Sequence, residues 1–294
     1  MKILYEKFGL WNVIGWFFAF PGLMLLICVM GFPLIYALIL SVSSFTMISP
    51  IILPFTGLDN FRRLSADPLF WNSVYITLVY TVSTVTAQFV IGLSVALMLN
   101  RIRRGKAFYF TVLAVPLAMS PVSVGLIWRM LLQPNLGIIN TTLRGLGFEG
   151  VDWLGNPAYA LWTIAFIDIW QQVSFVALVL AAGLAALPKE PYEAAAFDEA
   201  NVLQQFLYIT LPMLRPVASI VLIIQTINEI KTYDLVYVLT RGGPGVSTEL
   251  LSYFSYKVAF LGLAVNEGSA SSTVLLLMSL MASVIFFMTI SKRA

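Results

Sequence analysis

Long apolar stretches dominate the chain and alternate with shorter polar segments. A helix that crosses a membrane needs about 20 mostly apolar residues. Prolines within such stretches do not argue against spanning helices, because neighbouring groups can satisfy the freed backbone. The pattern therefore predicts an all-α integral membrane protein that forms one domain over residues 1–294. Its six expected spans are residues 13–40, 72–99, 107–132, 160–187, 213–239 and 270–290.

The composition also indicates that lipid surrounds most of the chain. The 294 residues are 60% hydrophobic and 11% charged, with a mean hydropathy of +0.90, whereas soluble domains carry about 25% charged residues. A water-soluble chain of this length could not bury so much apolar surface. The lone cysteine, Cys28, excludes an intrachain disulfide. The absence of histidine excludes imidazole metal sites, His-based triads and His proton relays.

The distribution of charge predicts an orientation. The net charge of +3 is too small to indicate nucleic-acid binding. Cytoplasmic loops of membrane proteins carry an excess of Lys and Arg, and a cytoplasmic N-terminus would place ten of the 17 basic residues inside. They are Lys2, Lys7, Arg101, Arg103, Arg104, Lys106, Lys189, Arg215, Lys292 and Arg293. Five would lie outside: Arg62, Arg63, Arg144, Arg241 and Lys257.

Both termini are therefore expected in the cytoplasm. The first apolar stretch is too long for the core of a signal peptide and is expected to remain as a span. The basic cluster at residues 101–106 acts in this interpretation as a topology determinant that also contacts anionic lipid.

The polar segment between the fourth and fifth expected spans, residues 188–212, is rich in helix-forming residues. Pro191 suits a first helical turn, and Glu193 and Asp198 flank an alanine run of high helix propensity. Pro212 and Pro216 mark the return to the membrane. These residues alone predict a helical surface hairpin, which either merely connects two spans or docks a partner.

The same segment resembles the EAA loop of permeases of bacterial binding-protein-dependent ABC sugar importers. The motif residues are Glu193, Ala194 and Ala195, then Asp198, Ile209, Leu211 and Pro212. Other parts of the chain resemble the maltose-type and glycerol-3-phosphate-type permeases in the same order. They are Asn100, Arg104-Gly105, Pro116, Trp128, Gly137, Asn140, Trp170-Gln171-Gln172, Phe175, Ala182-Gly183-Leu184, Leu239–Pro244 and Thr248-Glu249.

This resemblance implies the type I ABC importer permease fold and a transport subunit without catalytic activity. It further implies a second, homologous permease, two ATPase subunits that bind ATP and Mg²⁺, and an extracytoplasmic binding protein that delivers a mono- or disaccharide. The location would be the bacterial cytoplasmic membrane. The residues implied in coupling to the ATPase are Glu193, Ala194, Ala195, Asp198, Glu199, Ala200, Leu211 and Pro212.

One position departs from the family pattern, which has Asp-Gly-Ala where this chain has Asp198-Glu199-Ala200. Glycine would permit a tight turn between two short helices because it adopts positive φ without strain. Glutamate at residue 199 favours a continued helix instead. We therefore expect the geometry of the coupling loop to differ from the family's.

Polar side chains within the spans mark either a transport pathway or contacts between helices. In the fourth span they recur at i, i+3 and i+4, and in the fifth span the same spacing places several on one face. Amides, carboxylates and Tyr suit a sugar, because they bond its hydroxyls and pack on its C–H faces. The pathway candidates are Gln171, Gln172, Asn228, Glu229, Tyr233 and Asp234.

Other interpretations of these residues remain open. Lys231 and Asp234 are three residues apart and could neutralise one another, and Asp168 could lie near the outer leaflet and meet water. An ion-driven secondary transporter could use Asp168, Glu229 and Asp234, although no internal inverted repeat is evident. An intramembrane enzyme is disfavoured, because the chain has no histidine, serine elbow or metal motif.

The chain is expected to hold no cofactor and no metal. Its Gly242-Gly243-Pro244 turn lacks the lysine of a nucleotide-binding loop. A phosphorylated substrate such as glycerol-3-phosphate, or a related polyol or phosphodiester, would need an accessible base in the pathway. Only Lys231 and Arg129 qualify by position, which favours a neutral sugar over these alternatives.

Overall fold

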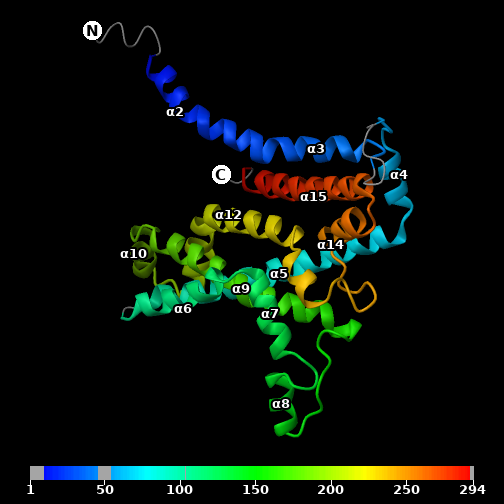
Figure 1. Ribbon diagram of the computed structural model, residues 1–294. Coiled ribbons are helices and arrows are strands. Elements are labelled where there is room, and N and C mark those ends of the chain that lie inside the picture. The colour runs from blue at the N-terminus through cyan, green and yellow to red at the C-terminus, as the bar shows by residue number, and fades with distance from the viewer. Residues whose placement is uncertain (1–9, 46–53, 103, 292–294) are drawn as a thin grey trace. The chain divides into compact units, whose positions relative to one another are not determined.

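The computed structural model describes residues 10–45, 54–102 and 104–291 (Figure 1). Five of the residues used in the charge argument, Lys2, Lys7, Arg103, Lys292 and Arg293, lie outside these ranges. Within them the regular structure is helical, apart from an isolated bridge between Ser43 and Phe55. The chain forms two compact units. One takes the described residues up to Ala66 together with Lys257–Thr273, and the other takes Asp67–Tyr256 and the described residues from Val274.

The first unit contains an apolar helix followed by a cluster of hydrogen-bonded polar residues. Helices α2 (Leu10–Leu26) and α3 (Phe32–Ser41) are joined through the π-helical turn η1 (Ile27–Gly31). Residues 16–41 of this helix are long and apolar enough to span a membrane. Most of its described side chains are exposed, as expected of a helix surrounded by lipid. The unit is completed by α4 (Asp59–Ala66), η3 (Lys257–Leu261) and the first part of α15 (Val265–Ser291).

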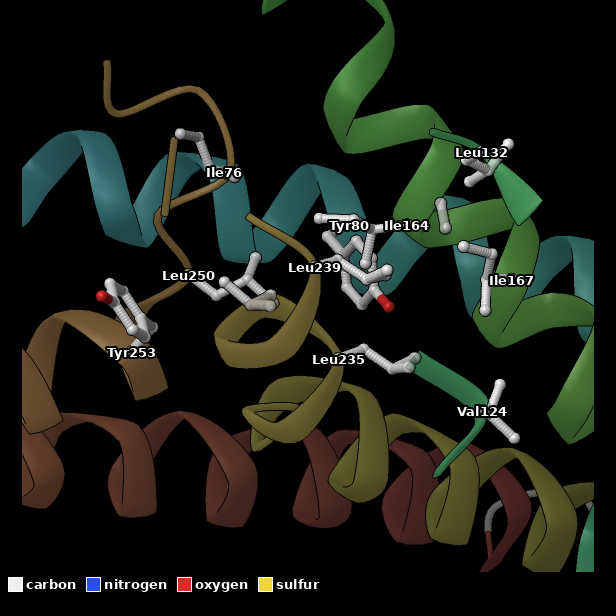
Figure 2. Close-up of a cluster of buried hydrophobic side chains, with 12 residues drawn as sticks. Ile76, Tyr80, Val124, Leu132, Ile164, Ile167, Leu235, Leu239, Leu250 and Tyr253 are labelled. Carbon is white, nitrogen blue, oxygen red and sulfur yellow. The ribbon is translucent and has the colours of Figure 1, made fainter. Parts of the chain in front are cut away.

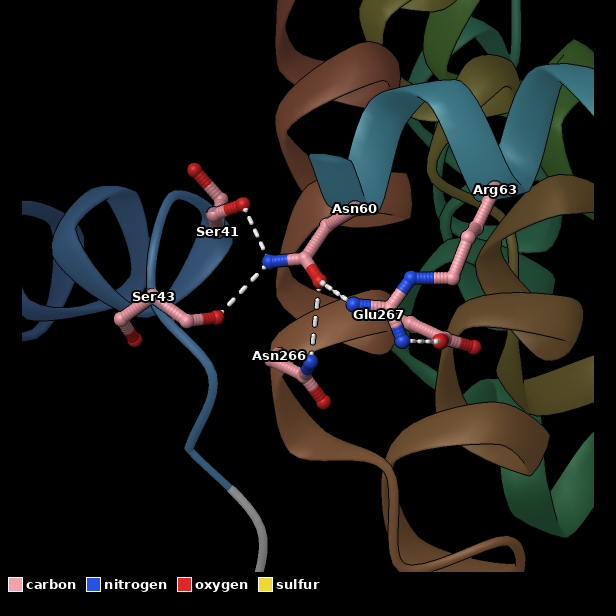
Figure 3. Close-up of polar contacts among 6 residues, drawn as sticks. All are labelled: Ser41, Ser43, Asn60, Arg63, Asn266 and Glu267. Atoms are coloured by element: carbon pink, nitrogen blue, oxygen red, sulfur yellow. Dashed lines mark hydrogen bonds and ion pairs between the residues drawn. The ribbon is translucent and has the colours of Figure 1, made fainter. Parts of the chain in front are cut away.

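Asn60 is the central residue of this polar cluster (Figure 3). Its side-chain amide is fully buried and donates to the carbonyl oxygens of Ser41 and Ser43, both at 2.8 Å. Its oxygen accepts from Asn266 at 2.9 Å. Arg63 of the same helix reaches Glu267 at 3.0 Å. Asn60 thus satisfies the backbone groups left free where α3 ends, which water cannot reach.

The second unit contains the remaining spans and their connections (Figure 1). Its core is the close pairing of α5 with α9, against which α6 and α12 also pack. Its helices are α5 (Pro68–Arg101), α6 (Lys106–Ala118), α7 (Pro121–Leu131), α8 (Ile138–Gly145), α9 (Pro157–Ala185), α10 (Glu190–Phe197), α11 (Val202–Gln205), η2 (Phe206–Thr210), α12 (Leu211–Ile230), α13 (Asp234–Leu239), α14 (Leu251–Tyr256) and the last part of α15.

Local sequence sets where the two longest helices begin. Asp67 and Asn156 precede a proline, and each accepts a 2.9 Å hydrogen bond from the backbone N–H two residues on. A polar cap followed by proline at the first helical position is a strong helix start. Both helices therefore begin a few residues before the expected spans at 72 and 160.

The third expected span, residues 107–132, corresponds to two helices joined by a sharp bend. Helices α6 and α7 meet at 90° with a break at Met119 and Ser120. Pro121 causes the break, because it lacks an N–H and forces the residue before it into extended backbone, as the ψ of 136° at Ser120 shows. Gln171 of α9 donates to the freed carbonyl of Met119 at 2.8 Å.

The fifth span also differs from the expected range of 213–239. A helical segment runs from α11 through the π-helical turn η2 into α12, so the candidate span begins at Val202. The helix then stops at Ile230 and resumes as α13 at Asp234. Of the expected pathway residues, Tyr233 lies on this irregular stretch of backbone, and Asp234 begins the helix that follows it.

Two apolar clusters stabilise the second unit. In the first, side chains from α5, α7, α9, α13 and α14 surround Tyr80, which is fully buried (Figure 2). The second joins α5, α9 and α12 around Leu180 and Leu214. Gly92 of α5 permits the close pairing with α9, because a Cβ at this position would lie 2.6 Å from the Cγ1 of Val176.

Candidate functional site

A helical hairpin at residues 190–205 carries the EAA motif. Helix α10 ends at Phe197, and the backbone turns at Glu199, which has a φ of +57°. The N–H of Ala200 bonds to the carbonyl of Ala195 at 2.9 Å, and that of Glu199 to the carbonyl of Ala196 at 3.3 Å. This pair of bonds is a Schellman motif, whose left-handed residue is usually glycine.

The expectation that glutamate at residue 199 continues the helix is therefore wrong. The Schellman bonds and the start of α11 at Val202 impose the turn although the residue has a Cβ. Asn201 caps α11 by accepting from the N–H of Gln204, whose side chain bonds back to Asn201. The chain thus turns between α10 and α11 at residue 199 without the glycine of the family pattern.

The hairpin presents an acidic and apolar tip. Glu193, Ala194, Asp198 and Glu199 are exposed, while Ala195 and Ala200 are half-buried in the turn. Phe197 is 89% exposed. The other two predicted coupling residues, Leu211 and Pro212, lie half-buried at the start of α12 and beyond η2. At the base of the hairpin, the hydroxyl of Tyr192 bonds to that of Thr210 at 3.0 Å.

A second candidate site is a cavity of about 250 Å³ in the second unit, which we call the polar cavity. It lies where α9 meets the irregular stretch between α12 and α13. The structure brings all six predicted pathway residues to its wall. Its lining residues are Pro121, Asp168, Gln171, Gln172, Asn228, Glu229, Lys231, Thr232, Tyr233, Asp234 and Leu235.

Buried hydrogen bonds hold one wall of the polar cavity. The hydroxyl of Tyr80 donates to Oδ2 of Asp168 at 2.5 Å. The Nε2 of Gln88 donates to Oε1 of Glu229 at 2.9 Å, and the Nε2 of Gln225 donates to Oε1 of Gln88 at 3.0 Å. The bonds link α5 to α9 and α12, so the polar groups both line the cavity and join the helices.

The structure decides between several interpretations left open by the sequence. Asp168 is 3% exposed and bonded to Tyr80, so it is buried in the second unit and lies at the polar cavity. Lys231 and Asp234 form no ion pair within the described residues. The guanidinium of Arg129 donates to the carbonyl of Val238 at 2.9 Å and lines a different cavity. Lys231 is therefore the basic side chain at the polar cavity.

Sequence reasoning missed Tyr80 and Gln88 as members of this site. Both lie in a stripe of polar residues that repeats every three or four positions along the second span, a spacing that places them on one face. That stripe was the available signal, since a spanning helix facing only lipid would not carry it. Its buried members are Ser73, Thr77, Tyr80, Thr81, Thr84 and Gln88.

No group of three or more His, Cys, Asp or Glu side chains in the described ranges could hold a metal ion. The polar cavity offers amide, carboxyl, hydroxyl and ammonium groups but no paired nucleophile and base. Its chemistry suits binding of a polar, hydroxylated molecule rather than bond cleavage.

Comparison with known proteins identifies relatives that are transport permeases. Residues 88–294 match the family described as "Binding-protein-dependent transport system inner membrane component". The chain is 34% identical to the trehalose/maltose transport system permease protein MalF of Thermococcus litoralis, over 79% of each chain. It is 32% identical to the sulfoquinovosyl glycerol transport system permease protein SmoG of Agrobacterium fabrum, over 93% of this chain and 89% of that one.

A further relative is the sn-glycerol-3-phosphate transport system permease protein UgpA of Yersinia pestis, which is 30% identical over 81% of each chain. Among solved structures, a chain of a bacterial ABC transporter that imports the acidic polysaccharide alginate superposes with a TM-score of 0.84. The two chains are 19% identical, and the match covers 99% of each. This likeness shows the fold predicted from the sequence, that of ABC importer permeases.

Proposed function

Because the chain belongs to the family of binding-protein-dependent transport system inner membrane components, we propose that it is the transmembrane subunit of an ATP-driven importer for a neutral mono- or disaccharide. As a permease it is a transport subunit and not an enzyme, as predicted. Its long apolar helices make it a multi-pass membrane protein. Its place is the bacterial cytoplasmic membrane, with both termini and the 190–205 hairpin in the cytoplasm.

The observation that carries this proposal is the 190–205 hairpin. An exposed phenylalanine at the tip of a short helix is unfavourable in water, and a hydrophobic groove on a partner protein would cover it. Phe197 has this position, and the carboxylates of Asp198 and Glu199 beside it call for basic residues in the same groove. The proposed partner is an ATPase subunit, and we assign the binding of ATP and Mg²⁺ to that subunit.

The complete importer contains two ATPases, a second homologous permease and an extracytoplasmic binding protein. A solved alginate transporter is a complex with a pentasaccharide-bound periplasmic protein, which supports the last of these partners. ATP-driven closure of the ATPases moves the hairpins, and the two permeases alternate between inward- and outward-facing states. Such a change needs binding energy that differs between the two states, which the nucleotide supplies through the ATPases.

The polar cavity is the proposed substrate site. Its volume of about 250 Å³ lies slightly below the usual range for small-molecule sites, about 300–1,000 Å³. We therefore propose that the second permease completes it. Gln172, Asn228 and Thr232 offer hydrogen bonds to sugar hydroxyls, and the ring of Tyr233 offers a surface for the sugar's C–H face.

A cysteine crosslink tests the coupling claim. Ala194→Cys lies on the exposed face of α10 and is expected to form a crosslink to the ATPase in the assembled transporter. Ser94→Cys, exposed on α5 within the membrane span, is the matched control and is expected to form none. An intact complex in which Ala194→Cys gives no ATPase adduct removes the coupling claim.

Lys231 supports a second candidate, an anionic substrate such as sn-glycerol-3-phosphate. Its ammonium group lines the polar cavity without an ion-pair partner in the described residues. Calorimetry of the co-encoded binding protein against neutral sugars and glycerol-3-phosphate distinguishes the two candidates. For a neutral sugar, Lys231→Met should leave the KM of import within a few-fold, whereas for an anion it should raise KM at least tenfold, since about 1.4 kcal/mol of charge pairing is lost.

A further inference from the structure

Import of a neutral sugar does not explain the two buried acids beside the polar cavity. Asp168 of α9 is 3% exposed and Glu229 of α12 is 1% exposed. Neither forms an ion pair within 4.0 Å in the described ranges, where the ion pairs are Arg62–Asp59 and Arg63–Glu267. A buried carboxylate without a cation is destabilised because it loses its hydration, and two that lie close together also repel each other.

The hydrogen bonds around the pair leave one oxygen without a donor. Asp168 accepts from Tyr80, and Glu229 accepts at Oε1 from Gln88. The two carboxyl groups line the same cavity and are close enough to interact electrostatically. Oε2 of Glu229 is fully buried and receives no N–H or O–H from any described residue. Two ionised carboxylates cannot form a hydrogen bond, because both are acceptors only.

We propose that Asp168 and Glu229 share one proton, which is carried on Oε2 of Glu229 and donated to Asp168. The proton turns the unpartnered oxygen into a donor, so each group in the pair gains a partner. It also leaves one negative charge on the pair instead of two. The Tyr80 bond places that charge, since 2.5 Å is the length typical of a hydroxyl bonded to an ionised carboxylate.

The shared proton extends a chain of hydrogen bonds that positions a substrate group. From Glu229 the chain runs through Gln88 and Gln225 to Asn228, whose Nδ2 lies 3.4 Å from Oε1 of Gln225. Asn228 lines the polar cavity. Removing the proton would bring two like charges into contact and separate α9 from α12, which would displace Asn228. Asp168 and Glu229 thus act as positioning residues.

The groups that face the pair define what else could titrate with it. Tyr80 approaches from α5, and no other titratable side chain of α5 bonds to either acid. Lys231, Tyr233 and Asp234 line the same cavity from the segment after α12. A monovalent cation held between two ionised carboxylates is the competing arrangement, and it predicts a different response to substitution.

Glu229→Gln tests the proton directly. Its side chain has the shape of the protonated acid and supplies the same donor permanently, so import by the assembled transporter at neutral pH should be at least fivefold higher in Glu229→Gln than in Glu229→Ala. Glu229→Ala removes the donor and should lower import at least tenfold. As pH rises into the alkaline range, import by the unaltered transporter should fall relative to Glu229→Gln, which has no proton to lose at this position.

Infrared spectroscopy of the purified full-length chain gives a readout that does not depend on transport. At neutral pH the spectrum should contain the carbonyl stretch of a protonated carboxyl group. The band should vanish in Glu229→Gln and persist in Asp152→Asn, whose carboxylate bonds to the N–H of Gly155 in an exposed loop.

Two results would overturn the shared proton. One is the absence of the protonated-carboxyl band from the unaltered chain, a measurement that needs no variant to fold. The other is loss of import in Glu229→Gln equal to that in Glu229→Ala together with a dependence on sodium or potassium, which would assign a cation to the pair. A failed Ala194→Cys crosslink would refute the proposed ATPase coupling and would leave the infrared result standing.

Discussion

Replacing Glu199 by glycine should stabilise the turn of the 190–205 hairpin. The residue has a φ of +57°, a conformation that costs a residue with a Cβ about 1–2 kcal/mol. Glycine removes this cost but loses more backbone entropy on folding, about 0.5–1 kcal/mol. The expected net gain for Glu199→Gly is about 0.5–1 kcal/mol, which lowers the population of the opened turn about twofold to fivefold.

Hydrogen exchange followed by mass spectrometry measures this opening. The reporter is the amide of Ala200, which bonds to the carbonyl of Ala195 only while the turn is closed. Its protection factor, corrected for the intrinsic exchange rate, should rise about twofold to fivefold in Glu199→Gly. The measurement uses the full-length chain in detergent or nanodiscs.

The matched control is Glu199→Gln, which removes the charge and keeps the Cβ. A negative charge near the C-terminal end of α10 is unfavourable by about 0.3–1 kcal/mol at low salt and is screened as salt rises. At high salt, Glu199→Gln should therefore match the unaltered chain. Equal protection in Glu199→Gly and Glu199→Gln under these conditions would refute the assignment of strain to residue 199.

Three further substitutions test packing and buried polar contacts, each by thermal or denaturant unfolding of the purified chain. Asn60→Leu leaves two buried carbonyls without a donor and should lower stability by about 1–3 kcal/mol for each; an unchanged unfolding midpoint would contradict this role. Gly92→Ala drives a Cβ to within 2.6 Å of Val176 and should cost about 1–3 kcal/mol, most of which Val176→Ala restores. Tyr80→Phe removes the donor to Asp168 and should cost about 1.5–3 kcal/mol; full stability in this variant would mean that the bond is not formed.

The spanning helices and the chemistry of the cavity could be predicted from the sequence. Apolar length alone indicated the segments that form α5, α9 and α12, because lipid requires backbone hydrogen bonds to be satisfied within each helix. Helical spacing placed Gln171 and Gln172 on one face of α9. It likewise placed Asn228 and Glu229 on one face of α12. The family resemblance of the chain, carried by the EAA motif and its flanking residues, is confirmed over residues 88–294.

Contacts between distant segments decided the rest. Pro121 breaks the helix, but the 90° angle between α6 and α7 is a tertiary feature, and Gln171 of α9 satisfies the carbonyl of Met119 at the bend. The turn at Glu199 forms against local preference because the Schellman bonds and the start of α11 outweigh the strain of one residue. The hydrogen bonds from Tyr80 to Asp168 and from Gln88 to Glu229 join helices through residues that lie 88 and 141 positions apart in the sequence. Spacing along one helix assigns a residue to a face, but which face of another helix it meets depends on how the helices pack.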